Sequence, residues 1–195
     1  ATLQPVQSLD QLYVQAAGLH PYLLRKVQEW ALSSNGKFCT ENDDGTGRFV
    51  AWADALADPG QMARVKFASL KRPDRAVEKV VRTYNNKVCS LLDVCRQCIV
   101  FASVDDLACC LSTIGDDPDI AIVLIKNRLS LEYDDTSTAG YRDVNLNVRI
   151  CSAETQRLKL NRHVCEVQLI LASFAEVKTE QGHKRYVSYR NARAA

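Results

Sequence analysis

Two short segments of the sequence alternate polar side chains with apolar ones. In residues 143–150, an aspartate, two asparagines and an arginine are interleaved with valine, leucine, valine and isoleucine. In residues 163–170, Glu166 and Gln168 share one face and apolar residues occupy the other. This alternation predicts two strands, each with an apolar face toward a core and a polar face. The polar face could bind a ligand or be an ordinary solvated sheet face, and periodicity leaves both interpretations open.

Positive charge is concentrated in residues 64–87, which hold eight basic and two acidic residues in a chain of net charge +2. Pro73 is well placed as the first residue of a helix, on which Arg75, Lys79 and Arg82 share a face. Arginine and lysine on one face favour phosphate binding. A solvated helix face is the alternative. Nucleic-acid binding is less favoured, because the segment holds only two aromatic residues.

Two carboxylates are candidates for holding a metal ion. Asp93 lies at the start of a predicted strand, 91–101, and Glu166 in the middle of another. If these strands are neighbours in one sheet, the two carboxylates could share Mg²⁺, which phosphate transfer uses together with cations on the polyphosphate. Tyr141, after Gly140, could stack a nucleobase at the mouth of the same face.

The cysteines indicate an intracellular, reducing compartment rather than a disulfide scaffold. Seven of the eight lie in apolar stretches, where cysteine behaves as a small buried hydrophobe. Cys95 and Cys98 form a CxxC pattern within the strand predicted at 91–101, so their thiols are expected on opposite faces. Redox CxxC pairs lie at helix N-termini instead, and thiol or metal-thiolate chemistry is therefore not favoured.

The elements that must position these groups follow from periodicity and turn residues. We expect helices at 8–33 (broken into two at Pro21), 61–88, 104–114 and 171–190, strands at 91–101, 120–126, 142–151 and 163–170, a loop at 35–47 and a turn at 58–60. The pattern predicts an α+β fold with a mixed sheet of about five strands flanked by helices and an N-terminal helical extension. Residues 1–60 form the extension and loop, and 61–195 the main domain.

Composition agrees with a globular chain: 47% of the 195 residues are hydrophobic and 25% are charged. No apolar run approaches the ~20 residues that span a bilayer. No secretory segment is visible either, and the cytoplasm, a plastid or a mitochondrion remain open as compartments.

These motifs, taken in order, resemble the RelA/SpoT-like alarmone synthetases, whose fold is nucleotidyltransferase-like. The resemblance covers residues 61–190. It rests on Arg64-Val65-Lys66 with Ser69, on Asp93 in Leu-Leu-Asp-Val, on Gly140-Tyr141, and on Glu166-Val167-Gln168. The resemblance implies Mg²⁺-dependent transfer of pyrophosphate from ATP to the 3′-hydroxyl of a guanine nucleotide.

The resemblance also implies a role for each matching residue. Asp93 and Glu166 would hold the metal, Glu166 would accept the proton of the attacking hydroxyl, and Gln168 would orient substrate. The nucleotide would be bound by Arg64, Lys66, Ser69, Lys71, Arg75, Arg96, Tyr141 and Asn145, with Tyr141 stacking the acceptor base.

The sequence departs from the family pattern at several positions. Cys98 and Ile170 stand where the family has arginines, and Tyr186 stands where it has a late histidine. Segments such as Gly140-Tyr141-Arg142-Asp143 are similar to a divergent eukaryotic branch found in algae and other protists. A second interpretation is therefore kept: a catalytically degenerate fold that serves as a binding or structural subunit of a larger, organellar or cytoplasmic assembly. It would dock protein partners through its N-terminal helices.

Overall fold

The computed structural model describes residues 6–41, 47–134 and 140–177. Its elements, in chain order, are α1 (Leu9–Ser33), β1 (Lys37–Glu41), β2 (Gly47–Ala51), α2 (Trp52–Ala57), α3 (Pro59–Arg64), α4 (Pro73–Tyr84), the 3₁₀ turn η1 (Val88–Ser90), β3 (Arg96–Phe101), α5 (Val104–Asp116), β4 (Ile120–Asn127), β5 (Val144–Ile150), α6 (Ala153–Arg157), β6 (Cys165–Leu171) and α7 (Ala172–Val177).

A six-stranded sheet organises the molecule, in the order β2-β1-β3-β6-β5-β4. Strands β3 and β6 are parallel, and the other neighbours are antiparallel. The predicted α+β class with a mixed sheet is confirmed, with six strands rather than about five. The division of the chain at residue 60 stays a prediction, although β1 and β2 belong to this same sheet.

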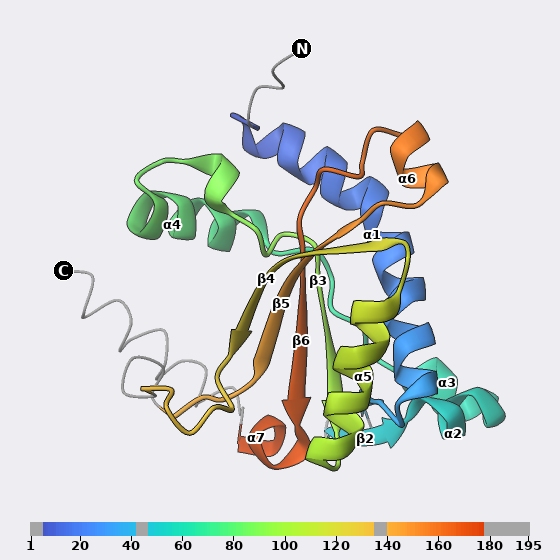
Figure 1. The fold of residues 1–195 in the computed structure, drawn as a ribbon. Coiled ribbons are helices and arrows are strands. Elements are labelled where there is room, and N and C mark those ends of the chain that lie inside the picture. Colours follow the sequence, from blue (N-terminus) through green and yellow to red (C-terminus); the bar gives the residue numbers. More distant parts are fainter. Residues whose placement is uncertain (1–5, 42–46, 135–139, 178–195) are drawn as a thin grey trace.

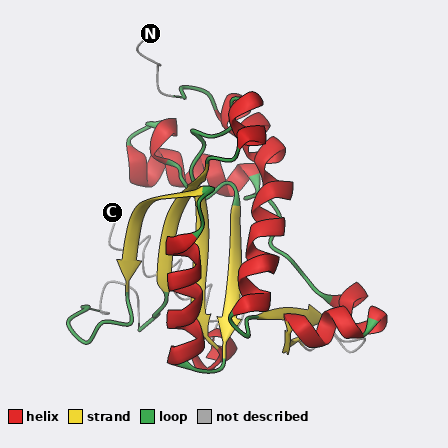
Figure 2. Ribbon diagram, turned by 45° about the vertical axis from the view of Figure 1, so that its right-hand side comes forward, coloured by secondary structure: helices red, strands yellow, loops and turns green. Residues whose placement is uncertain are grey.

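Helices α1 and α5 run side by side across one face of the sheet, as Figures 1 and 2 show. That face carries the apolar side chains of the alternating strands, and Leu146, Val148, Val167 and Leu169 are fully buried. The polar residues of the same strands point to the opposite face, because strand side chains alternate with a period of two. The polar-face prediction for 143–150 and 163–170 is therefore confirmed by the register of β5 and β6.

Helix α1 is continuous, so the predicted break at Pro21 is wrong. Pro21 lies inside the helix and His20 keeps helical geometry. Proline removes one backbone hydrogen bond. Leu19 and Leu23 on either side are fully buried against the sheet, and we attribute the continuity of the helix to this packing.

Two further local predictions are wrong in the N-terminal part. The segment 35–47, predicted as a loop, contains β1, which pairs with β2 from Lys37↔Ala51 to Glu41↔Gly47. The turn predicted at 58–60 is the start of α3, where the Asp58 carboxylate accepts hydrogen bonds from the backbone N–H groups of Gly60 and Gln61. Asp-Pro is a helix start as well as a turn signal, because proline suits the first helical position.

The helix predicted at 61–88 is instead two helices, α3 and α4, joined by an extended segment at 65–72. Pro73 begins α4, as predicted. The strand predicted at 91–101 begins only at Arg96, so Asp93 precedes it. Of the helix predicted at 171–190, residues 172–177 form α7, and 178–190, including Tyr186, lie outside the described residues.

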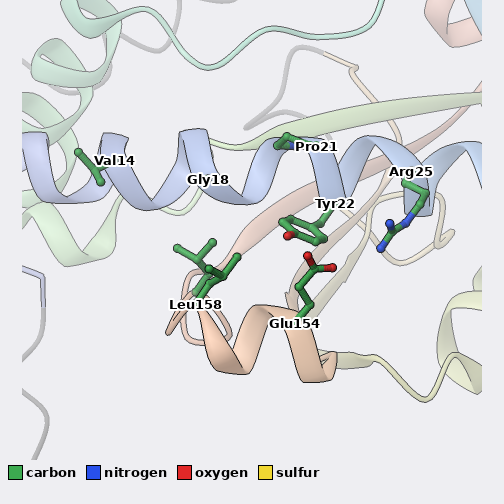
Figure 3. Close-up of a pocket in the computed structure, with 8 residues that line it drawn as sticks. Val14, Gly18, Pro21, Tyr22, Arg25, Glu154 and Leu158 are labelled. Carbon is green, nitrogen blue, oxygen red and sulfur yellow. The ribbon is translucent and has the colours of Figure 1, made fainter.

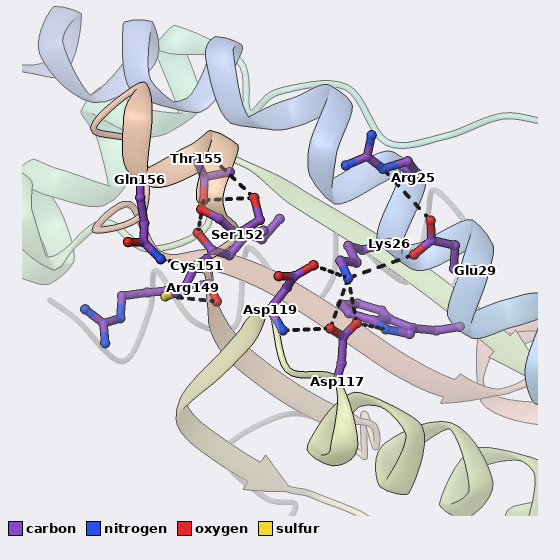
Figure 4. A network of polar contacts seen from close by, with 12 residues as sticks. Arg25, Lys26, Glu29, Asp117, Asp119, Arg149, Cys151, Ser152, Thr155 and Gln156 are labelled. Atoms are coloured by element: carbon purple, nitrogen blue, oxygen red, sulfur yellow. Dashed lines mark hydrogen bonds and ion pairs between the residues drawn. The ribbon is translucent and has the colours of Figure 1, made fainter.

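A buried ion-pair network fixes α1 against the turn that leads into β4 (Figure 4). The Lys26 ammonium donates to both oxygens of Asp117 and to Asp119, each at 3.0 Å, and the Trp30 indole donates to Asp117 at 3.0 Å. Burial disfavours the ionised form of Asp117, but the hydrogen bonds from Lys26 and Trp30 outweigh it and hold the pKa of Asp117 below its ordinary value. The network stabilises the helical layer of the fold.

Candidate active site

A cluster of charged side chains surrounds Asp93. This carboxylate is 6% exposed, and its Oδ2 atom accepts hydrogen bonds from the ammonium groups of Lys71 and Lys79, both at 2.8 Å. Lys71 comes from the extended segment before α4, and Lys79 from the middle of α4. Figure 1 shows α4 beyond the end of the sheet at which β3 and β6 begin.

The cluster keeps Asp93 ionised despite its burial. Burial raises the pKa of Asp93, but Lys79 and Lys71 outweigh that effect and leave the pKa below its ordinary value. For Lys79, burial lowers the pKa, and the charge of Asp93, with a contribution from Glu166, raises it above the ordinary value. Burial lowers the pKa of Lys71, and neighbouring Lys79 and Arg96 act in the same direction. Two cations therefore share one buried anion.

Glu166 joins the cluster from the adjacent strand. Strands β3 and β6 are parallel neighbours in which Arg96 is opposite Glu166, and the Glu166 backbone N–H donates to the Cys95 carbonyl at 3.0 Å. Parallel strands start at the same edge of a sheet, so Asp93 and Glu166 lie at one end of this pair. The two strands are neighbours, which was the condition for the two carboxylates to meet, and Arg96 is directly opposite Glu166 in the register.

The oxygen atoms at this edge suit a magnesium ion that arrives with a polyphosphate. The Asp93 Oδ1 atom is buried without a hydrogen-bond partner. In the described part of the chain, no group of three or more His, Cys, Asp and Glu side chains is placed to hold a metal. Mg²⁺ binds through one or two carboxylates together with substrate phosphates, so Asp93 and Glu166 fit that mode of binding. They do not form a metal cage of their own.

Further along the polar face, the amides predicted to bind substrate lie next to each other. Asn145 is opposite Gln168 in β5 and β6, and Cys98 is opposite Gln168 on the other side. Asn145 is 4% exposed, whereas Gln168 is half-buried. This part of the face offers amide donors and acceptors beyond the charged edge.

Tyr141 takes part in a network with Asp143 and Arg128. Its hydroxyl donates to Asp143 Oδ2 at 3.0 Å, and the Arg128 guanidinium pairs with Asp143 Oδ1. Burial raises the pKa of Tyr141, and the negative charge of Asp143 raises it further. The ring is half-buried with its hydroxyl oriented by Asp143. Base stacking by Tyr141 stays a prediction.

Four of the residues predicted to bind nucleotide make other contacts or lie on exposed backbone. Lys66 pairs with Glu41 at 3.1 Å, and Arg75 pairs with Glu78 at 2.9 Å, both at exposed positions. Arg64 is the exposed last residue of α3, and Ser69 is exposed on the segment that follows. The structure thus brings Lys71 and Arg96 to the two carboxylates.

Lys79 is the main site residue that was not selected from the sequence. Helical spacing placed it on the basic face of α4 with Arg75 and Arg82. Those two arginines both pair with Glu78 instead, at 2.9 and 3.1 Å. Only the position of Asp93 in space distinguishes Lys79 from them. The pairing of Arg128 with Asp143, fifteen residues away, gave no local signal in the sequence.

The cysteines do not form a reactive centre among the described residues. All eight are free; Cys95, Cys110 and Cys165 are buried, and Cys98 is half-buried. The expectation of burial is wrong for Cys89 and Cys109, which are exposed. Cys95 precedes β3 rather than lying in it, so the argument from opposite strand faces does not apply to it.

A groove of about 620 Å³ lies elsewhere, between α1 and α6 (Figure 3). Its lining combines apolar side chains such as Val14 and Leu158 with Tyr22, Arg25 and Glu154. It contains neither of the carboxylates described above and none of the lysines. Its residues do not provide the chemistry found at Asp93, so we assign the candidate active site to the charged edge.

No described helix has the length and apolar character needed to cross a membrane.

Comparison with solved structures shows the fold to be that of the small alarmone synthetases. The Bacillus subtilis small alarmone synthetase 2 aligns with a TM-score of 0.57 at 17% identity, over 93% of this chain and 81% of that chain. A GTP pyrophosphokinase family protein from Streptococcus pneumoniae aligns with a TM-score of 0.53 at 16% identity, over 90% and 75%.

The Bacillus subtilis small alarmone synthetase 1 aligns with a TM-score of 0.50 at 18% identity, over 64% of this chain and 62% of that chain. The same protein bound to its product pppGpp aligns with a TM-score of 0.50 at 16% identity, over 65% and 69%. No family model matches the sequence, and no curated protein does. At these identities the likeness establishes the fold and leaves the activity to be argued from the site.

Proposed function

We propose that the chain transfers pyrophosphate from ATP to the 3′-hydroxyl of a guanine nucleotide. The observation that carries this proposal is the arrangement of Lys71 and Lys79 on the buried Asp93 carboxylate, beside Glu166. Transfer of a phosphate group needs cations where negative charge develops and carboxylates that hold Mg²⁺. The shared fold with small alarmone synthetases supports the same reaction class.

In this proposal the lysines and Arg96 bind the phosphates of ATP and compensate charge during transfer. Glu166 accepts the proton of the attacking hydroxyl. The 3′-oxygen forms a bond to the β-phosphorus, the bond between that phosphorus and the α,β-bridging oxygen breaks, and AMP leaves. Mg²⁺ would be held by Asp93 and Glu166 and would polarise the phosphoryl oxygens. Gln168 and Asn145 would orient the acceptor, and Tyr141 would stack its base.

The test is conversion of ATP with GDP or GTP in the presence of Mg²⁺, followed by separation of the nucleotide products. Glu166→Gln keeps the size of the side chain and removes the base, so it should abolish turnover while the circular dichroism spectrum stays unchanged. Arg82→Gln is the matched control, because Arg82 pairs with Glu78 away from Asp93. Turnover by Glu166→Gln at the wild-type rate would contradict the assignment.

A second candidate is a non-catalytic binding module, and Ile170 favours it. The side chain lies on the same strand face as Glu166 and Gln168, is 1% exposed, and stands where the family resemblance implies an arginine. A module of this kind would bind protein partners through α1. The similarity of the chain to the eukaryotic branch remains a prediction. Absence of nucleotide binding by calorimetry would support this candidate against the enzyme.

A further inference from the structure

The segment 65–72 is the least regular part of the proposed ATP site and yet carries Lys71. It forms neither helix nor named strand, apart from one isolated bridge between Val65 and Thr40. Lys71 within it must reach Asp93 at 2.8 Å. A free loop would lose conformational entropy whenever its side chains were ordered on a ligand. Something therefore has to hold this backbone in place.

The two ends of the segment are held by backbone hydrogen bonds. The Lys66 N–H donates to the Cys39 carbonyl of β1 at 2.8 Å, and the Lys71 N–H donates to the Val94 carbonyl at 2.9 Å. The Lys71 carbonyl accepts from the Tyr13 hydroxyl of α1. Each end is thus fixed to a different element of the fold.

The middle of the segment is held by a side chain. The Gln97 amide accepts from the Ala68 N–H at 3.1 Å and donates to the Ala68 carbonyl at 2.9 Å. This reciprocal pair is the pattern that a neighbouring strand would supply. Strand β1 pairs with β3 only at Lys37↔Val100, so it does not take up this position beside the start of β3.

His20 lies against the same carbonyl and the same amide. Its Nε2 atom lies 3.0 Å from the Ala68 oxygen and 3.2 Å from the Gln97 amide nitrogen. The carbonyl oxygen only accepts and the amide nitrogen only donates, so one contact needs a proton on Nε2 and the other needs Nε2 without one, and each tautomer satisfies one of the two. Gln97 is 2% exposed, so neither water nor another side chain can readily replace its amide.

We infer that Gln97 is a positioning residue of the ATP site. Its amide fixes Ala68 and thereby presents Lys71 to the triphosphate, without contact between Gln97 and the substrate. This inference rests on the proposed function for its ATP-binding part. The other part, that Gln97 restrains the Ala68 backbone, stands on the hydrogen bonds alone.

The experiment uses the full chain and the variant Gln97→Leu, which removes the donor and the acceptor at once. Hydrogen exchange of the Ala68 amide, followed by NMR, should become at least about tenfold faster relative to amides of α5, because its hydrogen bond is lost. The Kd of ATP, measured by calorimetry, should rise about tenfold, which corresponds to ordering roughly one backbone residue on binding. In turnover, KM for ATP should rise more than kcat falls.

Ile99→Ala is the matched control, since Ile99 is fully buried two residues further along the same face of β3. It should lower the free energy of unfolding. The ratio of the Ala68 exchange rate to the exchange rates of α5 amides (the Ala68 exchange ratio) and the Kd of ATP should stay near their wild-type values. Gln97→Asn keeps an uncharged amide but shortens its reach to Ala68, so it should give intermediate values, and it serves if Gln97→Leu does not fold.

These measurements test separately the restraint of Ala68 by Gln97 and the role of Gln97 in ATP binding. An unchanged Ala68 exchange ratio in the Gln97 variants would overturn the restraint. A faster exchange with an unchanged Kd of ATP, in a chain whose wild type binds ATP, would overturn the positioning role alone. If the wild-type chain does not bind ATP, the proposed function and the positioning role both fail, and the exchange result still decides the restraint.

Discussion

Replacing Asp93 by asparagine removes the one anion that Lys71 and Lys79 share. Both ammonium nitrogens lie 2.8 Å from the same oxygen, so they are no more than twice that distance apart. At an effective dielectric constant of about 20, two unit charges at that separation repel by about 3 kcal/mol. The three side chains are 9–22% exposed, so solvent screens this repulsion little. In the wild type the attraction of both lysines to Asp93 offsets this repulsion, and in Asp93→Asn nothing does. We therefore expect the free energy of unfolding to fall by about 3 kcal/mol at neutral pH, the size of loss typical when one partner of a buried ion pair is removed.

Urea denaturation at several pH values is the assay, because the penalty depends on protonation. In the variant, repulsion lowers the pKa of a folded-state lysine below its unfolded value of about 10.4. Between those two values the unfolded state binds more protons, so stability should rise with pH and recover part of the loss. ATP added without metal should raise the melting temperature of the variant more than that of the wild type, because its phosphates neutralise both lysines.

Asp74→Asn is the control, since Asp74 lies in the first turn of α4, where it pairs with exposed Arg72 and accepts a hydrogen bond from the Arg75 backbone, away from the two lysines. It should change the urea midpoint much less than Asp93→Asn and should show no recovery of stability at alkaline pH. The reasoning would be refuted by an Asp93→Asn variant as stable as the wild type, or by a loss of stability that does not recover at alkaline pH.

Three further predictions concern the rest of the fold. Lys26→Met leaves Asp117 buried without its cation and should cost about 3 kcal/mol in urea denaturation. Burial lowers the pKa of His163 to about 4, so as the pH falls from 6.5 to 4 the unfolded state takes up the proton first. The chain should then lose about 3 kcal/mol, a dependence that His163→Phe removes. Asp143→Asn removes a negative charge beside the phenol and should lower the pKa of Tyr141, which ultraviolet titration measures.

Features that depend on a residue's own neighbours in sequence were predictable. The alternation in residues 143–150 and 163–170 reflects a sheet with one buried face, and β5 and β6 have that register. Glu166 lies in the strand expected for it, whereas Asp93 precedes β3 rather than opening it. The alternation involves only residues close in sequence, so it can be recognised without knowledge of the rest of the fold.

Features that depend on distant partners were not predictable. The segment 65–72 has a helix-like composition, but its backbone is bonded to Cys39, Val94 and the Gln97 side chain. In the same way, burial of α1 against the sheet overrides the helix-breaking tendency of Pro21. Lys79, and not Arg75, is the basic residue of α4 that reaches the site, because Asp93 lies beside it. The helical periodicity of α4 does not reveal that position.

A last prediction, on the coupled binding of metal and nucleotide, follows from the charges of the site. Lys71 and Lys79 are both engaged by Asp93, so a polyphosphate must compete with this carboxylate for the lysines. A divalent cation on the Asp93 oxygens would offset the loss of the two ammonium groups, so Mg²⁺ and ATP should each strengthen the binding of the other by the same factor. Calorimetric titration of Mg²⁺ with and without ATP measures that factor. It should be clearly smaller in Asp93→Asn, where only Glu166 and the phosphates are left to hold the metal, whereas equal factors in both proteins would place the metal away from Asp93.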